Sequence, residues 1–116
     1  MVKIYGIKNC DTMKKALKWL DERHISYQFH NYKTDGLSSQ LLQSLFNLIE
    51  WQLLLNTKGT TWRKLDEATR NTINNQASAK QLMLQNPSII KRPILVAGDK
   101  ALVGFSEQLY QQFFAS

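Results

Sequence analysis

The spacing of hydrophobic residues changes twice near the start of the chain, and this limits the folds available to it. Residues 1–6 are largely apolar and β-prone, and they end at Gly6. From Thr12 the apolar side chains recur at helical spacing, whereas over residues 25–29 they alternate with polar ones. A strand–helix–strand start predicts two parallel strands joined by a right-handed crossover.

The rest of the chain is predicted to be helical and then β again. The apolar stripe and turn residues predict a helix near 38–50, short helical pieces near 61–75, and a helix near 78–86 that stops before Pro87. Two apolar runs, 93–97 and 101–103, flank a tight turn and indicate a hairpin. A final helix is expected at about 106–114. The candidate N-caps are Asn9, Asp11 or Thr12 for the first helix, Ser38 or Ser39 for the second, and Ser106 for the last.

This order of elements predicts an α/β fold built on a mixed four-stranded sheet with flanking helices. That is the thioredoxin-like architecture, here with a helical subdomain inserted at about 37–88. The 116 residues suffice for one domain, spanning 1–116.

Composition narrows the function classes. A single cysteine excludes an internal disulfide and a multi-cysteine zinc site, and it fits a reducing compartment. No apolar run is long enough for a membrane span or a signal peptide, so a cytoplasmic location without membrane contact is expected. His24 and His30 have no metal-ligand spacing, and no metal site is expected. The net charge of +6 favours anionic partners, but no nucleic-acid-binding module is present and nucleic acid is not an expected partner.

Cys10 lies between the first predicted strand and the first predicted helix. Unpaired N–H groups in a first helical turn favour a thiolate, and Lys8 adds a nearby cation. A small buried apolar residue is the alternative, but the predicted position at the carboxyl edge of the sheet favours a functional thiol. Met13 stands where a C-x-x-C motif would have its second cysteine. A thiol that resolves a mixed disulfide must therefore come from glutathione or another protein.

Two further segments carry weaker indications of a site. Pro93 opens an apolar run, which favours a plain strand boundary; the alternative is a cis proline beside the cysteine, with Arg92 directed at an anion. The polar stretch 56–63 contains glycine, hydroxyls and cations. It could bind an anion, but such a composition is also common in ordinary turns.

Three motifs together resemble the arsenate reductase (ArsC)/Spx-like family, and most closely its YffB branch. They are residues 4–12 (Ile-Tyr-Gly-Ile-Lys-Asn-Cys-Asp-Thr), residues 54–65 around Thr57-Lys58-Gly59, and residues 90–96 around Arg92-Pro93. The resemblance covers essentially the whole chain. It implies a thioredoxin-like fold with an inserted helical subdomain, a nucleophilic cysteine at Cys10, and a cis proline at Pro93 after an active-site arginine at Arg92.

The resemblance also implies limits on the substrate. Arsenate reductases of this family surround the cysteine with three arginines, of which Arg92 matches one. The second falls near Asn56, where Lys58 is the nearest cation, and the third falls near Gly104. Without these two charges, arsenate is not an expected substrate.

The function implied is that of a glutathione-dependent thiol reductase with a single nucleophilic cysteine. Cys10 and Arg92 are the expected catalytic residues. Substrate or glutathione is expected to contact the following residues: Lys8, Asn9, Asp11, Thr12, Lys58, Arg63 and Pro93. No bound cofactor is expected; glutathione is the co-substrate, and the second substrate is an unidentified small molecule or protein thiol. The alternative is an Spx-like regulator that binds RNA polymerase on an inactive redox fold, although Met13 removes the C-x-x-C switch.

Overall fold

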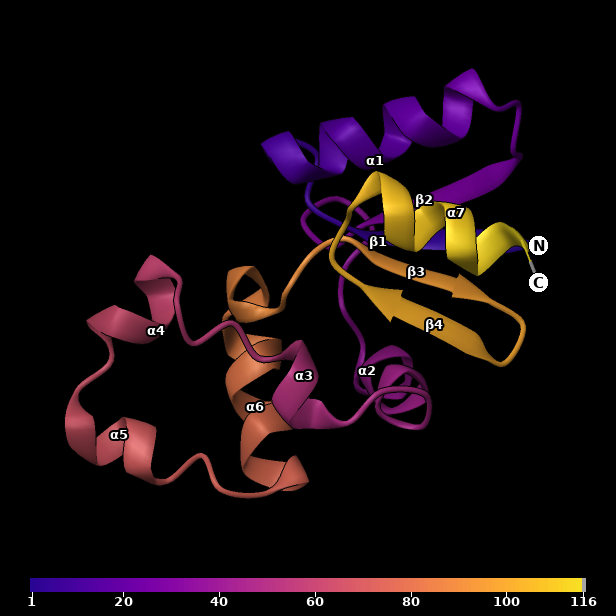
Figure 1. Ribbon diagram of the computed structural model, residues 1–116. Helices are drawn as coiled ribbons and strands as arrows, with labels where there is room; N and C mark the ends of the chain where they lie inside the picture. The colour runs from indigo at the N-terminus through magenta and orange to yellow at the C-terminus, as the bar shows by residue number, and fades with distance from the viewer. Residues whose placement is uncertain (116) are drawn as a thin grey trace. The chain divides into compact units, whose positions relative to one another are not determined.

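The computed structural model describes residues 1–115, which form two compact units (Figure 1). The first comprises Met1–Asp35 and the chain from Arg92 onward, and the second comprises Gly36–Lys91. Each unit is described by itself. Within the described residues, no helix combines the length and the apolar character needed to cross a bilayer.

The first unit contains the mixed four-stranded sheet that the sequence predicts. Its strands are β1 (Val2–Gly6), β2 (Tyr27–Asn31), β3 (Ile94–Ala97) and β4 (Lys100–Val103), in the order β2-β1-β3-β4. β1 and β2 run parallel, as a strand–helix–strand crossover requires, and β3 is antiparallel to both β1 and β4. Lys100, expected in the hairpin turn, is already part of β4.

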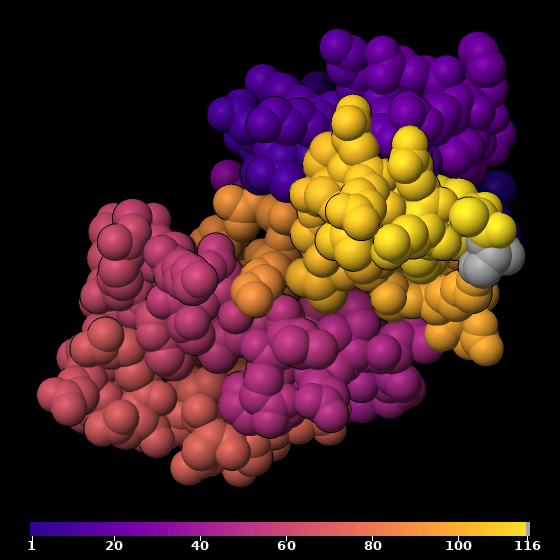
Figure 2. Space-filling view, viewed as in Figure 1, coloured from indigo at the N-terminus to yellow at the C-terminus, as the bar shows by residue number. Residues whose placement is uncertain are grey.

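Helices α1 (Asp11–Glu22) and α7 (Glu107–Ala115) pack on the same face of this sheet. Figure 2 shows α7 in yellow beside the indigo and purple surface of α1. The buried core beneath them consists of Ile4, Met13, Ala16, Trp19, Leu20, Leu95 and Tyr110. The predicted cap of α7 is confirmed, because the Ser106 hydroxyl oxygen accepts a hydrogen bond from the Leu109 N–H at 3.1 Å.

Gly6, the last residue of β1, lies directly under Met13 of α1. A Cβ at Gly6 would collide with the Met13 sulfur, so this close approach of strand and helix requires glycine. The Met13 side chain is fully buried. The position that a second cysteine would take in a C-x-x-C motif is therefore occupied here by a core residue.

The second unit consists of short helices. They are α2 (Ser39–Phe46), α3 (Trp51–Leu54), α4 (Thr60–Lys64), α5 (Glu67–Asn71), α6 (Gln76–Gln85) and a 3₁₀ turn over Pro87–Ile89. The single helix expected near 38–50 is wrong: α2 ends at Phe46, and α3 is a separate helix. The apolar stripe continues to Ile49, which is buried although it lies outside any helix.

Packing and caps hold the second unit together. α2 packs against α6, and Leu54, Leu55 and Ile90 are buried. The Lys91 N–H donates to the Leu54 carbonyl at 2.7 Å, which ties the last residue of the unit to the end of α3. By contrast, α4 and α5 bury none of their own residues.

Candidate functional site

Cys10 is the N-cap residue of α1, at the carboxyl end of β1. Its backbone is extended (φ −121°, ψ 129°), and its carbonyl accepts the first hydrogen bond of the helix from the Lys14 N–H at 3.0 Å. The expected caps Asn9, Asp11 and Thr12 are wrong, because Cys10 itself takes the N-cap position. The N–H groups of the first turn are therefore left facing the cysteine sulfur.

The environment of Cys10 favours its thiolate. Partial burial would raise the pKa of the thiol, but the N–H of Met13, the Arg92 guanidinium and the N–H of Thr12 outweigh it. The pKa is lowered from its ordinary value. Hydrogen bonds to the sulfur contribute, and the positive charge of Arg92 adds to them. The Cys10 residue is half-buried, so part of it is open to a reactant.

Lys8 does not contribute to this effect. It was expected to assist the thiolate, yet it is absent from the groups that lower the Cys10 pKa. Its side chain is exposed, and water screens the charge of an exposed lysine. Asn9 and Asp11 are also exposed next to the thiol, and Thr12 is half-buried.

Arg92 and Pro93 lie next to the sheet, immediately before β3. The Arg92–Pro93 peptide bond is cis, as the family resemblance implies, and Pro93 also precedes the first residue of β3, as a strand boundary would. Pro93 is buried, and its carbonyl accepts a hydrogen bond from the Gly104 N–H at 2.8 Å. Gly104 has a positive φ of 85°, a backbone conformation that favours glycine.

Lys58 and Arg63 belong to the second unit. The Lys58 N–H donates to Asn56 Oδ1 at 3.1 Å, and Arg63 Nε donates to the Gly59 carbonyl at 3.4 Å. Both side chains are exposed. These hydrogen bonds are those of an ordinary closed turn, and a role for Lys58 or Arg63 toward a ligand stays a prediction.

Sequence reasoning did not single out Tyr32, at the carboxyl end of β2. Its N–H donates to the Gly6 carbonyl at 2.9 Å, which places Tyr32 at the sheet edge from which the chain leads to Cys10. The side chain is 3% exposed, and its hydroxyl has no hydrogen-bond partner among residues 1–115. Burial raises its pKa, neighbouring Tyr5 acts in the same direction, and nearby Arg92 opposes this.

Residues 1–115 contain no cluster of three or more histidine, cysteine, aspartate or glutamate side chains able to hold a metal ion. The groups that these residues bring together are the Cys10 thiol with its lowered pKa, the Arg92 guanidinium and the cis Arg92–Pro93 peptide bond.

Comparison with known proteins identifies relatives of the whole chain. The model of the ArsC family matches residues 5–113. A solved structure of the YffB protein is 47% identical, with a TM-score of 0.89 over 97% of each chain. An arsenate reductase (ArsC) related protein from Brucella melitensis is 48% identical, with a TM-score of 0.79 over 99% of this chain and 95% of its own. The global transcriptional regulator Spx from Streptococcus pyogenes is 26% identical over 99% of this chain and 86% of its own.

Proposed function

Because the chain belongs to the ArsC family and has its thioredoxin-like fold, we propose that it is a glutathione-dependent thiol reductase with one nucleophilic cysteine. The observation that carries this proposal is the lowered pKa of Cys10, produced by the first turn of α1 and by Arg92. A thiolate is the reactive form in thiol–disulfide exchange. Arsenate is not the proposed substrate, because Asn56 and Gly104 take the places of two of the family's arginines.

The reaction proceeds by two exchanges. First, the Cys10 thiolate attacks one sulfur of a disulfide on a small molecule or protein; a Cys10–S–S bond forms, and the other sulfur leaves as a thiolate. A glutathione thiolate then attacks this mixed disulfide at the substrate-derived sulfur. Cys10 is released as a thiolate, and glutathione leaves in a mixed disulfide with that half of the substrate. These two exchanges complete the part played by Cys10; a second glutathione thiolate then attacks the glutathione sulfur of this mixed disulfide, which releases the second substrate thiol and oxidised glutathione. No second protein thiol is required, which agrees with the single cysteine in the sequence.

The remaining site residues have binding roles in this proposal. The backbone beside Pro93 pairs with the peptide of glutathione, and Arg92 holds an anionic group near the sulfur. Lys8, Asn9, Asp11 and Thr12 contact the substrate around the thiol. Lys58 and Arg63 are kept in this proposal as candidates for binding a glutathione carboxylate. No resident cofactor takes part, and the reducing conditions of the cytoplasm supply glutathione.

The pH dependence of Cys10 alkylation by iodoacetamide tests the basis of this proposal. The rate is expected to rise through an inflection below the ordinary pKa of a cysteine thiol, and Arg92→Leu is expected to move that inflection to higher pH. Lys91→Leu is the matched control, because it removes the adjacent, exposed cation. A slow reaction, or an unshifted inflection in the unmodified chain, would contradict an activated thiol.

Turnover gives the second test. Cys10→Ser is expected to abolish glutathione-linked reduction of a model disulfide while leaving the unfolding midpoint nearly unchanged. Full turnover in that variant would rule out Cys10 as the nucleophile.

A protein-binding function is the second candidate, and the similarity to Spx favours it. In that case the chain binds a partner such as RNA polymerase, and Cys10 is dispensable. Purified polymerase retained by the Cys10→Ser variant at cytosolic salt would support this alternative, and a lack of retention would count against it.

A further inference from the structure

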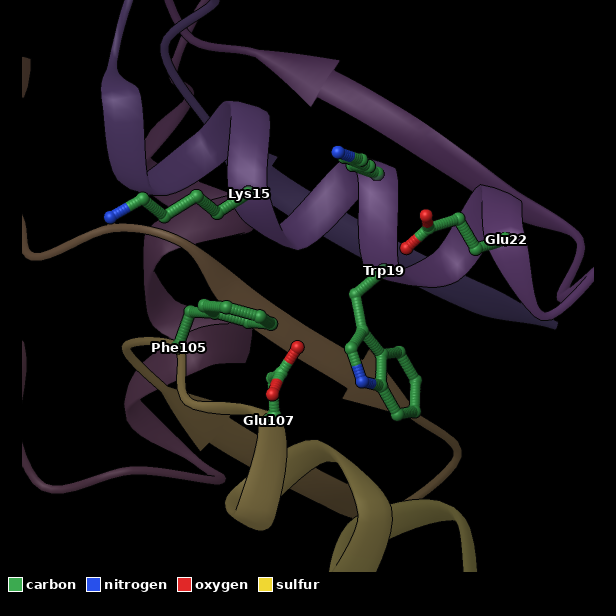
Figure 3. Close-up of a pocket in the computed structure, with 6 residues that line it drawn as sticks. Lys15, Trp19, Glu22, Phe105 and Glu107 are labelled. Carbon is green, nitrogen blue, oxygen red and sulfur yellow. The ribbon is translucent and has the colours of Figure 1, made fainter.

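A second candidate site lies on the first unit, between α1 and the start of α7. The pocket has a volume of about 360 Å³ and is lined by Lys15, Lys18, Trp19, Glu22, Phe105 and Glu107 (Figure 3). This volume lies within the range of small-molecule sites, roughly 300–1,000 Å³. None of these residues has a part in the proposed reductase chemistry.

Helical spacing explains one wall of the pocket. Lys15, Lys18, Trp19 and Glu22 stand at positions i, i+3, i+4 and i+7 of α1, so they share one face of the helix. Trp19 is the buried member of this set, and the other three are exposed. The helix therefore presents an aromatic ring bordered by charges of both signs.

The opposite wall comes from the segment that begins α7. Phe105 precedes the Ser106 cap, and its ring packs edge-on against Tyr110 at a centroid distance of 4.7 Å. Glu107 is the first residue of α7 and is exposed. Phe105 supplies an apolar surface, and Glu107 supplies a carboxylate near the mouth of the pocket.

Trp19 is held in one orientation by its other neighbours. Its ring stacks on Phe114 at 5.8 Å, meets Tyr110 edge-on at 5.4 Å, and lies under the Arg23 guanidinium at 4.0 Å. Trp19 is only 4% exposed, and its indole Nε1 has no hydrogen-bond partner among residues 1–115. Figure 3 shows this nitrogen edge turned toward Glu107 and the pocket. The nitrogen itself is buried, so a ligand in the pocket meets the edge of the Trp19 ring and not its N–H.

The charges identify the class of ligand. The lining carries two ammonium groups and two carboxylates, so it is balanced in charge within a strongly basic chain. A simple anion would be repelled by Glu22 and Glu107, and a simple cation by Lys15 and Lys18. A molecule with both charges satisfies both pairs: its carboxylate meets the lysines, and its ammonium meets the glutamates.

We infer that this pocket binds a small zwitterion with an apolar side group, such as a free amino acid or a dipeptide. The apolar group lies against Phe105 and the Trp19 ring. The site is separate from Cys10, so ligand binding does not depend on the thiol.

Nuclear magnetic resonance on the Cys10→Ser variant tests this inference without interference from thiol chemistry. The chain has three tryptophans, Trp19, Trp51 and Trp62, and therefore gives three indole N–H signals. The signal that is missing from the spectrum of the Trp19→Phe variant belongs to Trp19. L-phenylalanine, L-leucine and glycyl-L-phenylalanine are titrated to millimolar concentration. At least one is expected to shift the Trp19 signal saturably, while the signals of Trp51 and Trp62 stay in place.

Two sets of controls test the charge requirement. N-acetyl-L-phenylalanine lacks the ammonium, and L-phenylalaninamide lacks the carboxylate; each is expected to bind at least about tenfold more weakly. Glu107→Gln and Lys18→Gln are expected to weaken binding similarly, whereas Glu67→Gln and Lys33→Gln, which lie outside the pocket, leave it unchanged. No shift with any of the three ligands, equal shifts in all three indoles, or equal binding of the blocked analogues would overturn the inference.

Discussion

The two units of the chain are stabilised in different ways. In the first, a sheet and two helices enclose a continuous apolar core that includes fully buried Leu20 and Tyr110. In the second, α2, α6 and the 3₁₀ turn enclose a separate apolar core that includes fully buried Leu42, Leu54 and Met83, whereas α4 and α5 bury none of their residues. The candidate thiol lies in the unit whose core is enclosed by a sheet and two helices. A rigid framework there keeps the first turn of α1 and Arg92 aligned on the sulfur.

The largest predicted effect follows from the core of the first unit. Leu20→Ala is expected to lower the free energy of unfolding by about 2–5 kcal/mol, because it leaves a cavity under a fully buried helix face. Leu53→Ala in the second unit is the control: this leucine is 56% exposed, and its loss is expected to change stability by less than about 0.5 kcal/mol. Urea denaturation measures both. Equal losses in the two variants would show that burial does not decide the cost of truncating a leucine.

The next largest effect is expected from overpacking the contact between β1 and α1. Gly6→Ala is expected to cost about 1–3 kcal/mol, because the new methyl group meets the Met13 sulfur. Combining it with Met13→Ala tests the cause. The cost of Gly6→Ala should shrink in the Met13→Ala background, and strict additivity of the two changes would show that the collision is not the reason.

A smaller and more local effect is expected at the start of α6. The Asn75 side chain accepts a hydrogen bond from the Ser78 N–H at 2.8 Å, and the Ser78 hydroxyl closes a capping box. Asn75→Ala is expected to cost about 1 kcal/mol and to speed hydrogen exchange in α6. Asn74→Ala is the matched control, since the Asn74 side chain makes no capping bond. Faster exchange throughout the first unit would show that the two units do not respond separately.

The smallest predicted effect depends on pH. Burial raises the pKa of Tyr110, so the folded state favours the neutral phenol. The resulting stability is fully present below the ordinary tyrosine pKa of about 10 and is lost as the pH rises above it. Tyr110→Phe is expected to flatten this alkaline decline. Thermal unfolding between pH 8 and about 11 measures it, and an unchanged slope in the variant would contradict the assignment.

Much of the first unit was predictable because its patterns are local. The alternation in β2, the helical spacing in α1 and the turn between β3 and β4 each identify an element on their own. The break after Phe46 was not predictable, because Leu48 and Ile49 continue the apolar stripe and no glycine or proline marks the end of α2. Tertiary burial of Ile49 outside a helix overrides the local pattern.

The candidate site was predictable in its residues but not in its geometry. The position of Cys10 before a helix could be identified from spacing, yet cysteine is not a preferred cap residue, so the cap was assigned to its neighbours. The contribution of Lys8 was overestimated because sequence proximity does not reveal solvent screening. Trp19 is a packing residue of the core, and it also lines a pocket between α1 and the start of α7 that no local pattern in the sequence reveals.

The backbone conformation of Gly104 limits which residues can replace it without a loss of stability. An arginine at this position would have a clear space for its Cβ, but the positive φ of 85° would strain any residue other than glycine by about 1–2 kcal/mol. The Gly104 N–H is also fixed to the Pro93 carbonyl. An arginine at Gly104 would therefore bear this strain unless the turn after β4 adopted another conformation. A change at this position thus carries a cost in stability of its own, apart from any effect on the charge around the site.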